Sequence, residues 1–203
     1  MSSTSENSSL INIQQLMDLL QNERIVEYHN ISESTAKEFL EPADCKNLKI
    51  IMPDCAIFVS TLTYPTIAME IAYTETYEDL KENARLLLEG TAGEISVAIL
   101  VKIVPLRSDE SHIQSAFVQL YEYSSTQNRA IPRGGRKTLF PVPNNHARQR
   151  IEFSWEDVLK SQLPQIQPVS ATPPPLLLDD LREIIDAYTE RHIRLRDVEE
   201  RLN

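Results

Sequence analysis

The sequence predicts an α/β domain, in which a mixed β-sheet is flanked by helices, followed by a C-terminal helix. Two short stretches that alternate and are rich in β-branched residues precede an amphipathic helical pattern and then a nearly continuous apolar stretch. A continuous apolar strand is typical of the centre of a sheet that is covered on both faces. With 203 residues, 41% of them hydrophobic and 25% charged, the chain can form one domain with a substantial core.

The first part of the chain is expected to hold a tail and two short helices. Residues 1–9 (MSSTSENSS) lack the basic-then-apolar order of a secretory signal, which favours a disordered tail. Apolar residues at helical spacing predict a helix over residues 10–22. The stretch SESTAKEFLEP predicts a second helix that ends before Pro42.

Two strands and one helix are predicted next. Residues 48–59 and 66–73 alternate and are rich in β-branched residues, as strands are. Residues 76–89 form the clearest helical pattern, because Thr76 can cap the N-terminus with Asp79 three residues later. The apolar residues of this helix lie on one stripe: Tyr77, Leu80, Ala84, Leu87 and Leu88.

Three more strands are expected after this helix. Residues 94–104 (EISVAILVKIV) predict a central strand, because almost every residue is apolar. Residues 115–123 alternate and predict a second strand. Residues 137–142 (KTLFPV) predict a short strand at the sheet edge.

The chain is expected to divide into four parts. These are the disordered tail 1–9, a domain over 10–160, a Pro-rich linker over 161–175, and an amphipathic helix over 176–203. The apolar residues of the last part fit a heptad pattern that Arg191 interrupts: Leu181, Ile184, Tyr188, Leu195, Val198 and Leu202. Such a helix can pair with a second copy in a homodimer or fold back onto its own domain, and the sequence leaves both open.

The charge of the chain is unevenly distributed. A net charge of −10 disfavours a broad electrostatic grip on nucleic acid. Residues 126–150 nevertheless hold six Lys or Arg and no acid. Within this segment, Arg133, Arg136 and Lys137 are candidates for contact with nucleic-acid phosphates.

The cysteine content and the lengths of the apolar runs indicate where in the cell the protein is expected. The chain has two cysteines, Cys45 and Cys55, which form neither a four-thiolate zinc site nor a disulfide scaffold. No apolar run approaches the ~18–20 residues of a membrane span. We therefore expect an intracellular protein of the cytoplasm or nucleus that does not bind membranes.

Asp54 and Glu70 each stand as an acid inside an otherwise apolar strand pattern. If the two strands form an antiparallel hairpin with a short turn at residues 61–63, Asp54 lies directly opposite Glu70. Opposed like charges are destabilising, so a proton, a basic side chain or a divalent cation must offset them. Ala68 and Ala72 on the same face would leave room for a ligand. Carboxylates suit Mg²⁺ or Mn²⁺, either of which could activate water for phosphodiester cleavage.

The order and spacing of these motifs resemble the PD-(D/E)XK nuclease superfamily, and within it a group of uncharacterised fungal proteins. The resemblance covers residues 48–125 and is carried by the following residues: Pro53–Asp54, Pro65, Glu70, Tyr73–Thr74, Asp79–Leu80, Ala84, Gly93 and Ile95–Ile103. It implies a restriction-endonuclease-like core and a Mg²⁺- or Mn²⁺-dependent nuclease site. In that site Asp54 and Glu70 would hold the metal ion.

The chain departs from the family pattern at Ala72, where an active member carries the motif lysine two residues after the second acid. Members of the superfamily can place this lysine on the neighbouring helix, which makes Lys81 the candidate here. A lysine introduced at position 72 is expected to restore a cation beside Glu70. The N-terminal helices offer Glu33 and Glu38 as a third acid.

The sequence is compatible with two functions. One is a degenerate or weakly active metal-dependent nuclease-like domain that acts on nucleic acid. The other is a non-catalytic scaffold that uses the nuclease fold and associates with itself through residues 176–203. Ala72 and the acidic net charge favour the scaffold, and the two opposed acids favour the nuclease.

Overall fold

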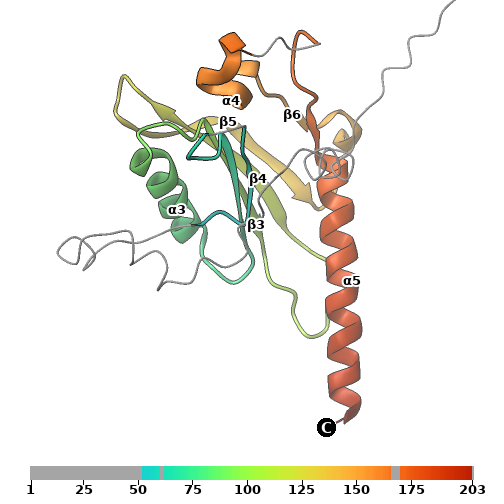
Figure 1. Ribbon diagram of the computed structural model, residues 1–203. Coiled ribbons are helices and arrows are strands. Elements are labelled where there is room, and N and C mark those ends of the chain that lie inside the picture. Colours follow the sequence, from blue (N-terminus) through green and yellow to red (C-terminus); the bar gives the residue numbers. More distant parts are fainter. Residues whose placement is uncertain (1–51, 60–61, 166–169, 203) are drawn as a thin grey trace, which may run out of the picture.

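The computed structural model describes residues 52–59, 62–165 and 170–202 as an α/β domain built on a mixed five-stranded sheet, ordered β1-β2-β3-β4-β5 (Figure 1). The predicted helices over 10–22 and 32–41, with Glu33 and Glu38, lie outside the described residues. The elements are β1 (Cys55–Ile57), β2 (Ile67–Ala72), α3 (Tyr77–Gly90), β3 (Val97–Ile103), β4 (Ala116–Ser124), β5 (Arg129–Phe140), η2 (His146–Arg148), β6 (Arg150–Ile151), α4 (Trp155–Leu159), η3 (Lys160–Gln165), β7 (Leu176–Leu177) and α5 (Leu178–Leu202).

The sheet combines antiparallel and parallel pairs. β1 and β2 form an antiparallel pair in which Cys55 faces Met69 and Ile57 faces Ile67, as the sequence predicted. β2 then connects through α3 to β3, which runs parallel to it, with Ile67 beside Val97. β4 and β5 are added in antiparallel order. The coarse α/β class is therefore confirmed.

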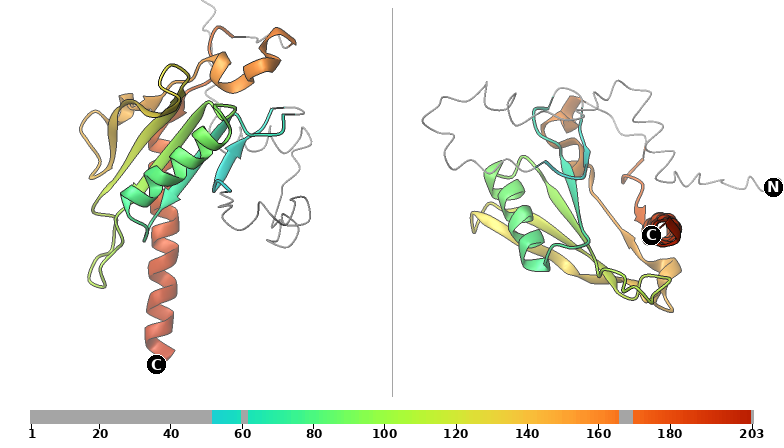
Figure 2. Two further views of the ribbon diagram at one scale, coloured as in Figure 1. Left: turned by 90° about the vertical axis from the view of Figure 1, so that its left-hand side faces the viewer. Right: turned by 90° about the horizontal axis from the view of Figure 1, so that it is seen from below.

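Helix α3 covers one face of the sheet (Figure 2). Its N-terminus has the predicted capping box, in which the Thr76 hydroxyl accepts a hydrogen bond from the Asp79 amide at 3.2 Å. The helix buries Leu80, Ala84, Leu87 and Leu88. These side chains pack on the even-numbered residues of β2 and β3: Ala68, Ala72, Ala98 and Leu100. Small residues on the strands let the helix approach the sheet closely.

The opposite face of the sheet forms the larger core cluster. The first half of α5 packs into it, with Leu178 fully buried, Leu181 4% exposed and Ile185 7% exposed. The predicted C-terminal helix therefore exists, and its first half folds back onto its own domain. Its second half extends beyond the sheet (Figures 1 and 2).

Two strands differ in length from the prediction. β1 is shorter than the predicted strand over residues 48–59, and β5 begins at Arg129 rather than at Lys137. The early part of β5 contains Pro132 and Gly134, which are rare in strand interiors but tolerated at a sheet edge or a bulge. Gly134 has a φ of +72° and lies where the β4–β5 pairing shifts register. No helix in the described part of the chain is long and apolar enough to cross a membrane.

Candidate functional site

Asp54 and Glu70 lie at the end of the β1–β2 ladder. Asp54 precedes Cys55 and Glu70 follows its partner Met69, so the two acids occupy the next opposed positions. Asp54 is exposed, and its Oδ2 accepts a hydrogen bond of 2.7 Å from the Ile71 backbone amide. Glu70 is 7% exposed and lies on the face of β2 that α3 covers. The register of the β1–β2 pair was predicted correctly.

The space around the acids differs from the prediction. Ala68 is fully buried and Ala72 is 1% exposed, because both pack against the apolar stripe of α3. The small residues therefore pack against the helix instead of bordering open space. The expectation that they leave room for a ligand is wrong, and the same packing leaves no space for a lysine at position 72.

Lys81 and Arg136 both lie over the ring of Tyr77. The Lys81 Nζ is 5.4 Å from the ring centroid, and the Arg136 guanidinium carbon is 4.2 Å from it. Arg136 also lies 4.5 Å from the centroid of Phe117, which contacts Tyr77 edge-to-face at 5.1 Å. Separate sequence arguments pointed to Lys81 and Arg136, and the fold brings them together. We call Tyr77, Lys81, Phe117 and Arg136 the Tyr77 cluster.

Lys81 also forms an ion pair, which affects whether its side chain can bind an anion such as phosphate. Its Nζ forms an ion pair of 2.5 Å with Glu78, whose side chain is 76% exposed. Pairs three residues apart on a helix contribute about 0.2–0.5 kcal/mol, so Lys81 can exchange this partner for a stronger anion at low cost.

Lys102 is a cation near the acids that sequence reasoning missed. It lies beside Ala72 on the neighbouring parallel strand, on the same face of the sheet as Glu70. Its Nζ donates to the backbone carbonyls of Tyr73 at 2.8 Å and Ile103 at 2.9 Å. Burial lowers the pKa of Lys102. The signal was available, because Lys102 is a charged residue inside a predicted apolar strand, as Asp54 and Glu70 are.

The three predicted nucleic-acid contacts do not form one surface. Arg133 makes a bidentate ion pair with Asp157, with N–O distances of 2.8 and 2.9 Å. Burial alone would raise the pKa of Asp157, but hydrogen bonds from Arg133 and Ser154 outweigh it and hold that pKa below its usual value. Arg133 therefore fixes α4 to the sheet. Lys137 pairs with Val118, which belongs to the core cluster that α5 covers, whereas Arg136 contacts Tyr77 of α3. The Lys137 and Arg136 side chains therefore lie on opposite faces of the sheet.

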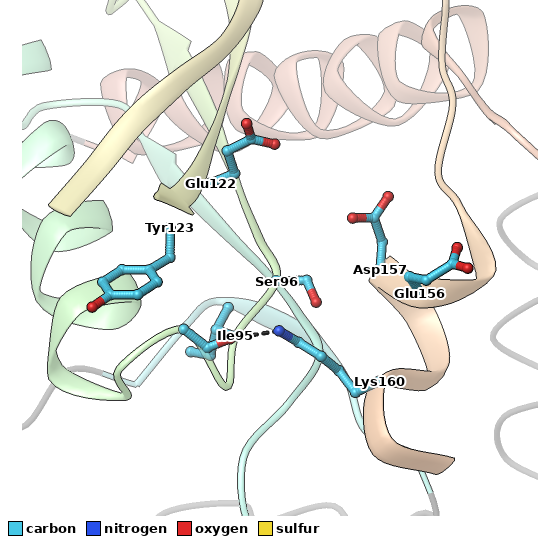
Figure 3. Close-up of a pocket in the computed structure, with 8 residues that line it drawn as sticks. Ile95, Ser96, Glu122, Tyr123, Glu156, Asp157 and Lys160 are labelled. Carbon is cyan, nitrogen blue, oxygen red and sulfur yellow. Dashed lines mark hydrogen bonds between the residues drawn. The ribbon is translucent and has the colours of Figure 1, made fainter. Parts of the chain in front are cut away.

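A separate open pocket lies near the amino-terminal end of β3, where Ile95 and Ser96 lead into the strand (Figure 3). It has a volume of about 370 Å³ and is lined by Gly93, Ile95, Ser96, Glu122, Tyr123, Glu156, Asp157 and Lys160. The Lys160 Nζ reaches across it and donates to the Gly93 carbonyl at 2.5 Å. The pocket lies between α4 and the sheet, and neither Asp54 nor Glu70 lines it.

The donor chemistry of Asp54 and Glu70 suits a hard divalent cation. Mg²⁺ usually keeps several waters and needs one or two protein carboxylates. Within residues 52–59, 62–165 and 170–202, no group of three or more His, Cys, Asp or Glu side chains is placed to hold a metal ion. Two carboxylates, Asp54 and Glu70, are therefore the candidate metal ligands at this site. The Asp54 carboxylate also accepts the hydrogen bond from the Ile71 amide.

The fold and these contacts define an α/β domain with a mixed five-stranded sheet, two acids at the end of its β1–β2 ladder, and the Tyr77 cluster on α3, β4 and β5. Comparison of the chain with protein-family models, with curated proteins and with solved structures gives no match in any of the three.

Proposed function

We propose that this chain is a divergent, weakly active nuclease-like domain, in which Asp54 and Glu70 hold Mg²⁺ or Mn²⁺ and the Lys81 and Arg136 side chains bind phosphate. The observation that carries the proposal is the β1–β2 register, because one further step beyond the Cys55–Met69 pair would set Asp54 opposite Glu70. Opposed acids cost stability unless a cation or a proton offsets their repulsion. A divalent ion bound there would supply an activated water and would stabilise charge that develops on a phosphodiester.

The cations of the site support phosphate binding. Lys81 and Arg136 lie on the same ring, and Lys102 lies on the same sheet face as Glu70. Arg136 can bind a phosphate through two parallel hydrogen bonds, and Lys81 can do so as a point charge. Lys102 already donates to two carbonyls, so its role is to hold the ends of β2 and β3 together. Lys81 is therefore the proposed replacement for the motif lysine.

Metal binding should raise the melting temperature of the wild-type protein. At a Mn²⁺ or Mg²⁺ concentration ten times the dissociation constant, we expect an increase of about 3–5 °C, because the ion binds the folded state only. Combining Asp54→Asn with Glu70→Gln should abolish the increase, since the amides keep the shape of the acids without their charge. The measurement is differential scanning calorimetry with and without metal.

The matched control for the metal titration combines Asp109→Asn with Glu94→Gln, which removes two exposed acids elsewhere on the surface. This control should respond to metal as the wild type does. If the Asp54 and Glu70 variant responds equally well, the proposed metal site is wrong.

Any metal-dependent cleavage of single- or double-stranded oligonucleotides should depend on Lys81. Loss of one group that stabilises developing charge typically lowers the rate about 10²–10³-fold. We therefore expect Lys81→Ala to reduce cleavage about 10²-fold. Arg85→Ala is the control, because Arg85 is exposed on the same helix and pairs with Glu82 and Glu89. Unchanged cleavage in Lys81→Ala would remove Lys81 from the site.

A non-catalytic scaffold is the second candidate, and the hydrogen bond from the Ile71 amide to Asp54 favours it. In that case the Asp54 carboxylate accepts the hydrogen bond of the Ile71 amide just beyond the start of β1, where the strand pairing ends, and Asp54 has a structural role. The scaffold function predicts no change in melting temperature with metal and no cleavage above background. These results would separate it from the nuclease-like function.

A further inference from the structure

Helix α5 has a second apolar stripe besides the one that packs on its own sheet. Ile184 is 38% exposed, Tyr188 68% and Leu195 56%. These residues are four and seven positions apart, so they lie along one side of the helix. Leu178, Leu181 and Ile185, on a different side, fill the core. The second stripe also continues into the half of α5 that extends beyond the sheet (Figures 1 and 2).

The charges of α5 are divided along its length. Residues 179–190 hold five acids, and their single base, Arg182, is buried and paired with Asp179. Residues 191–196 hold the bases Arg191, Arg194 and Arg196 and no acid. Residues 179–190 are therefore net negative and residues 191–196 net positive, and residues 197–202 add three acids and one base. A second α5 that ran in the opposite direction would place its basic part against the acidic part of the first.

We propose that this stripe binds a second copy of the chain, with the two α5 helices antiparallel. In the register that pairs the exposed residues, Ile184 contacts Leu195 of the partner subunit, and Tyr188 contacts Arg191 of the partner subunit. The twofold axis repeats both contacts. Arg191, which interrupts the apolar heptad pattern, then lies on an aromatic ring and forms a cation–π contact. A parallel pair would instead place each Arg191 against its own copy.

The proposal is independent of the proposed nuclease-like function, because none of its residues belongs to the metal site or to the Tyr77 cluster. It also explains why α5 carries apolar residues on two sides. One side stabilises the domain, and the other is available to a partner.

The mass of the full chain in solution tests the proposal. At about 100 µM, a concentration that populates an interface of modest area, sedimentation should give twice the chain mass of 23.2 kDa. Combining Tyr188→Glu with Leu195→Glu should give the monomer mass. The control is Val142→Glu, which changes an apolar residue of similar exposure, 49%, away from α5. A monomeric wild type, or a dimer that survives the double substitution, would overturn the proposal.

Cysteine cross-linking tests the antiparallel direction. With Cys45 and Cys55 replaced by serine, an oxidised mixture of the Ile184→Cys and Leu195→Cys variants should form a disulfide-linked dimer of one chain of each. Leu195→Cys alone should stay uncrosslinked, because its copies lie far apart in an antiparallel pair. Efficient cross-linking of Leu195→Cys with itself, without cross-linking in the mixture, would overturn the antiparallel arrangement.

Discussion

Replacing Arg182 with alanine should lower the free energy of unfolding by about 3 kcal/mol. Arg182 is 4% exposed, and its guanidinium joins α5 to β5 and the following segment. It donates to the backbone carbonyls of Leu139 and Thr138, each at 2.9 Å, and also to the side chains of Gln149 and Asp179. Its removal leaves buried acceptors without this donor and leaves a cavity.

Chemical denaturation of the full chain measures this loss. The control is Arg194→Ala on the same helix, because Arg194 and its partner Glu190 are each 70% exposed. Exposed pairs of this kind contribute at most ~1 kcal/mol, so this variant should stay close to the wild type. Similar stability losses in the two variants would show that Arg182 does not anchor the helix. A large loss in Arg182→Ala alone would establish α5 as part of the domain rather than as an appended helix.

Introducing lysine at position 72 should destabilise the protein by about 3–4 kcal/mol and should not increase cleavage. Ala72 is 1% exposed, and its methyl group contacts the apolar stripe of α3. A longer side chain must displace that helix, which costs about 1–3 kcal/mol, and its charge would be buried without water. The sequence alone favoured the opposite result, because it compared position 72 with the motif lysine without the helix that covers it.

Ile71→Lys is the matched control for the substitution at position 72. Ile71 is the preceding residue of β2 and is 43% exposed on the other side of the strand, so a lysine there remains in water. Urea denaturation should therefore show a large loss for Ala72→Lys and a small one for Ile71→Lys. A stable Ala72→Lys variant with faster metal-dependent cleavage would show that α3 can move away from the acids.

Local sequence patterns determined the elements and the pairing of their nearest neighbours. Thr76 and Asp79 marked the start of α3 because a capping box needs these residue types at this spacing. The apolar stripe identified the buried residues of α3 because helical periodicity places them on one side. The β1–β2 register was inferred from a short turn expected at residues 61–63, and the observed pairs have that register although β1 ends at Ile57 and β2 begins at Ile67.

The start of β5 could not be predicted from the same patterns. Pro132 and Gly134 are poor strand residues, and they are accommodated because β5 is an edge strand whose pairing with β4 shifts register. The role of Arg133 was also hidden, because its partner Asp157 is distant in the sequence. A basic segment in the sequence does not tell which of its charges are already paired.

By itself, the sequence determined which residues share a face of a strand or helix, because periodicity is a local property of the backbone. Only the tertiary structure decided what covers each face. Ala68 and Ala72 beside the acids could border a ligand or a helix, and α3 occupies that space. The apolar residues of α5 could face a core or a partner. The fold places Leu181 in the core and leaves Tyr188 exposed, because one side of a helix packs on one surface.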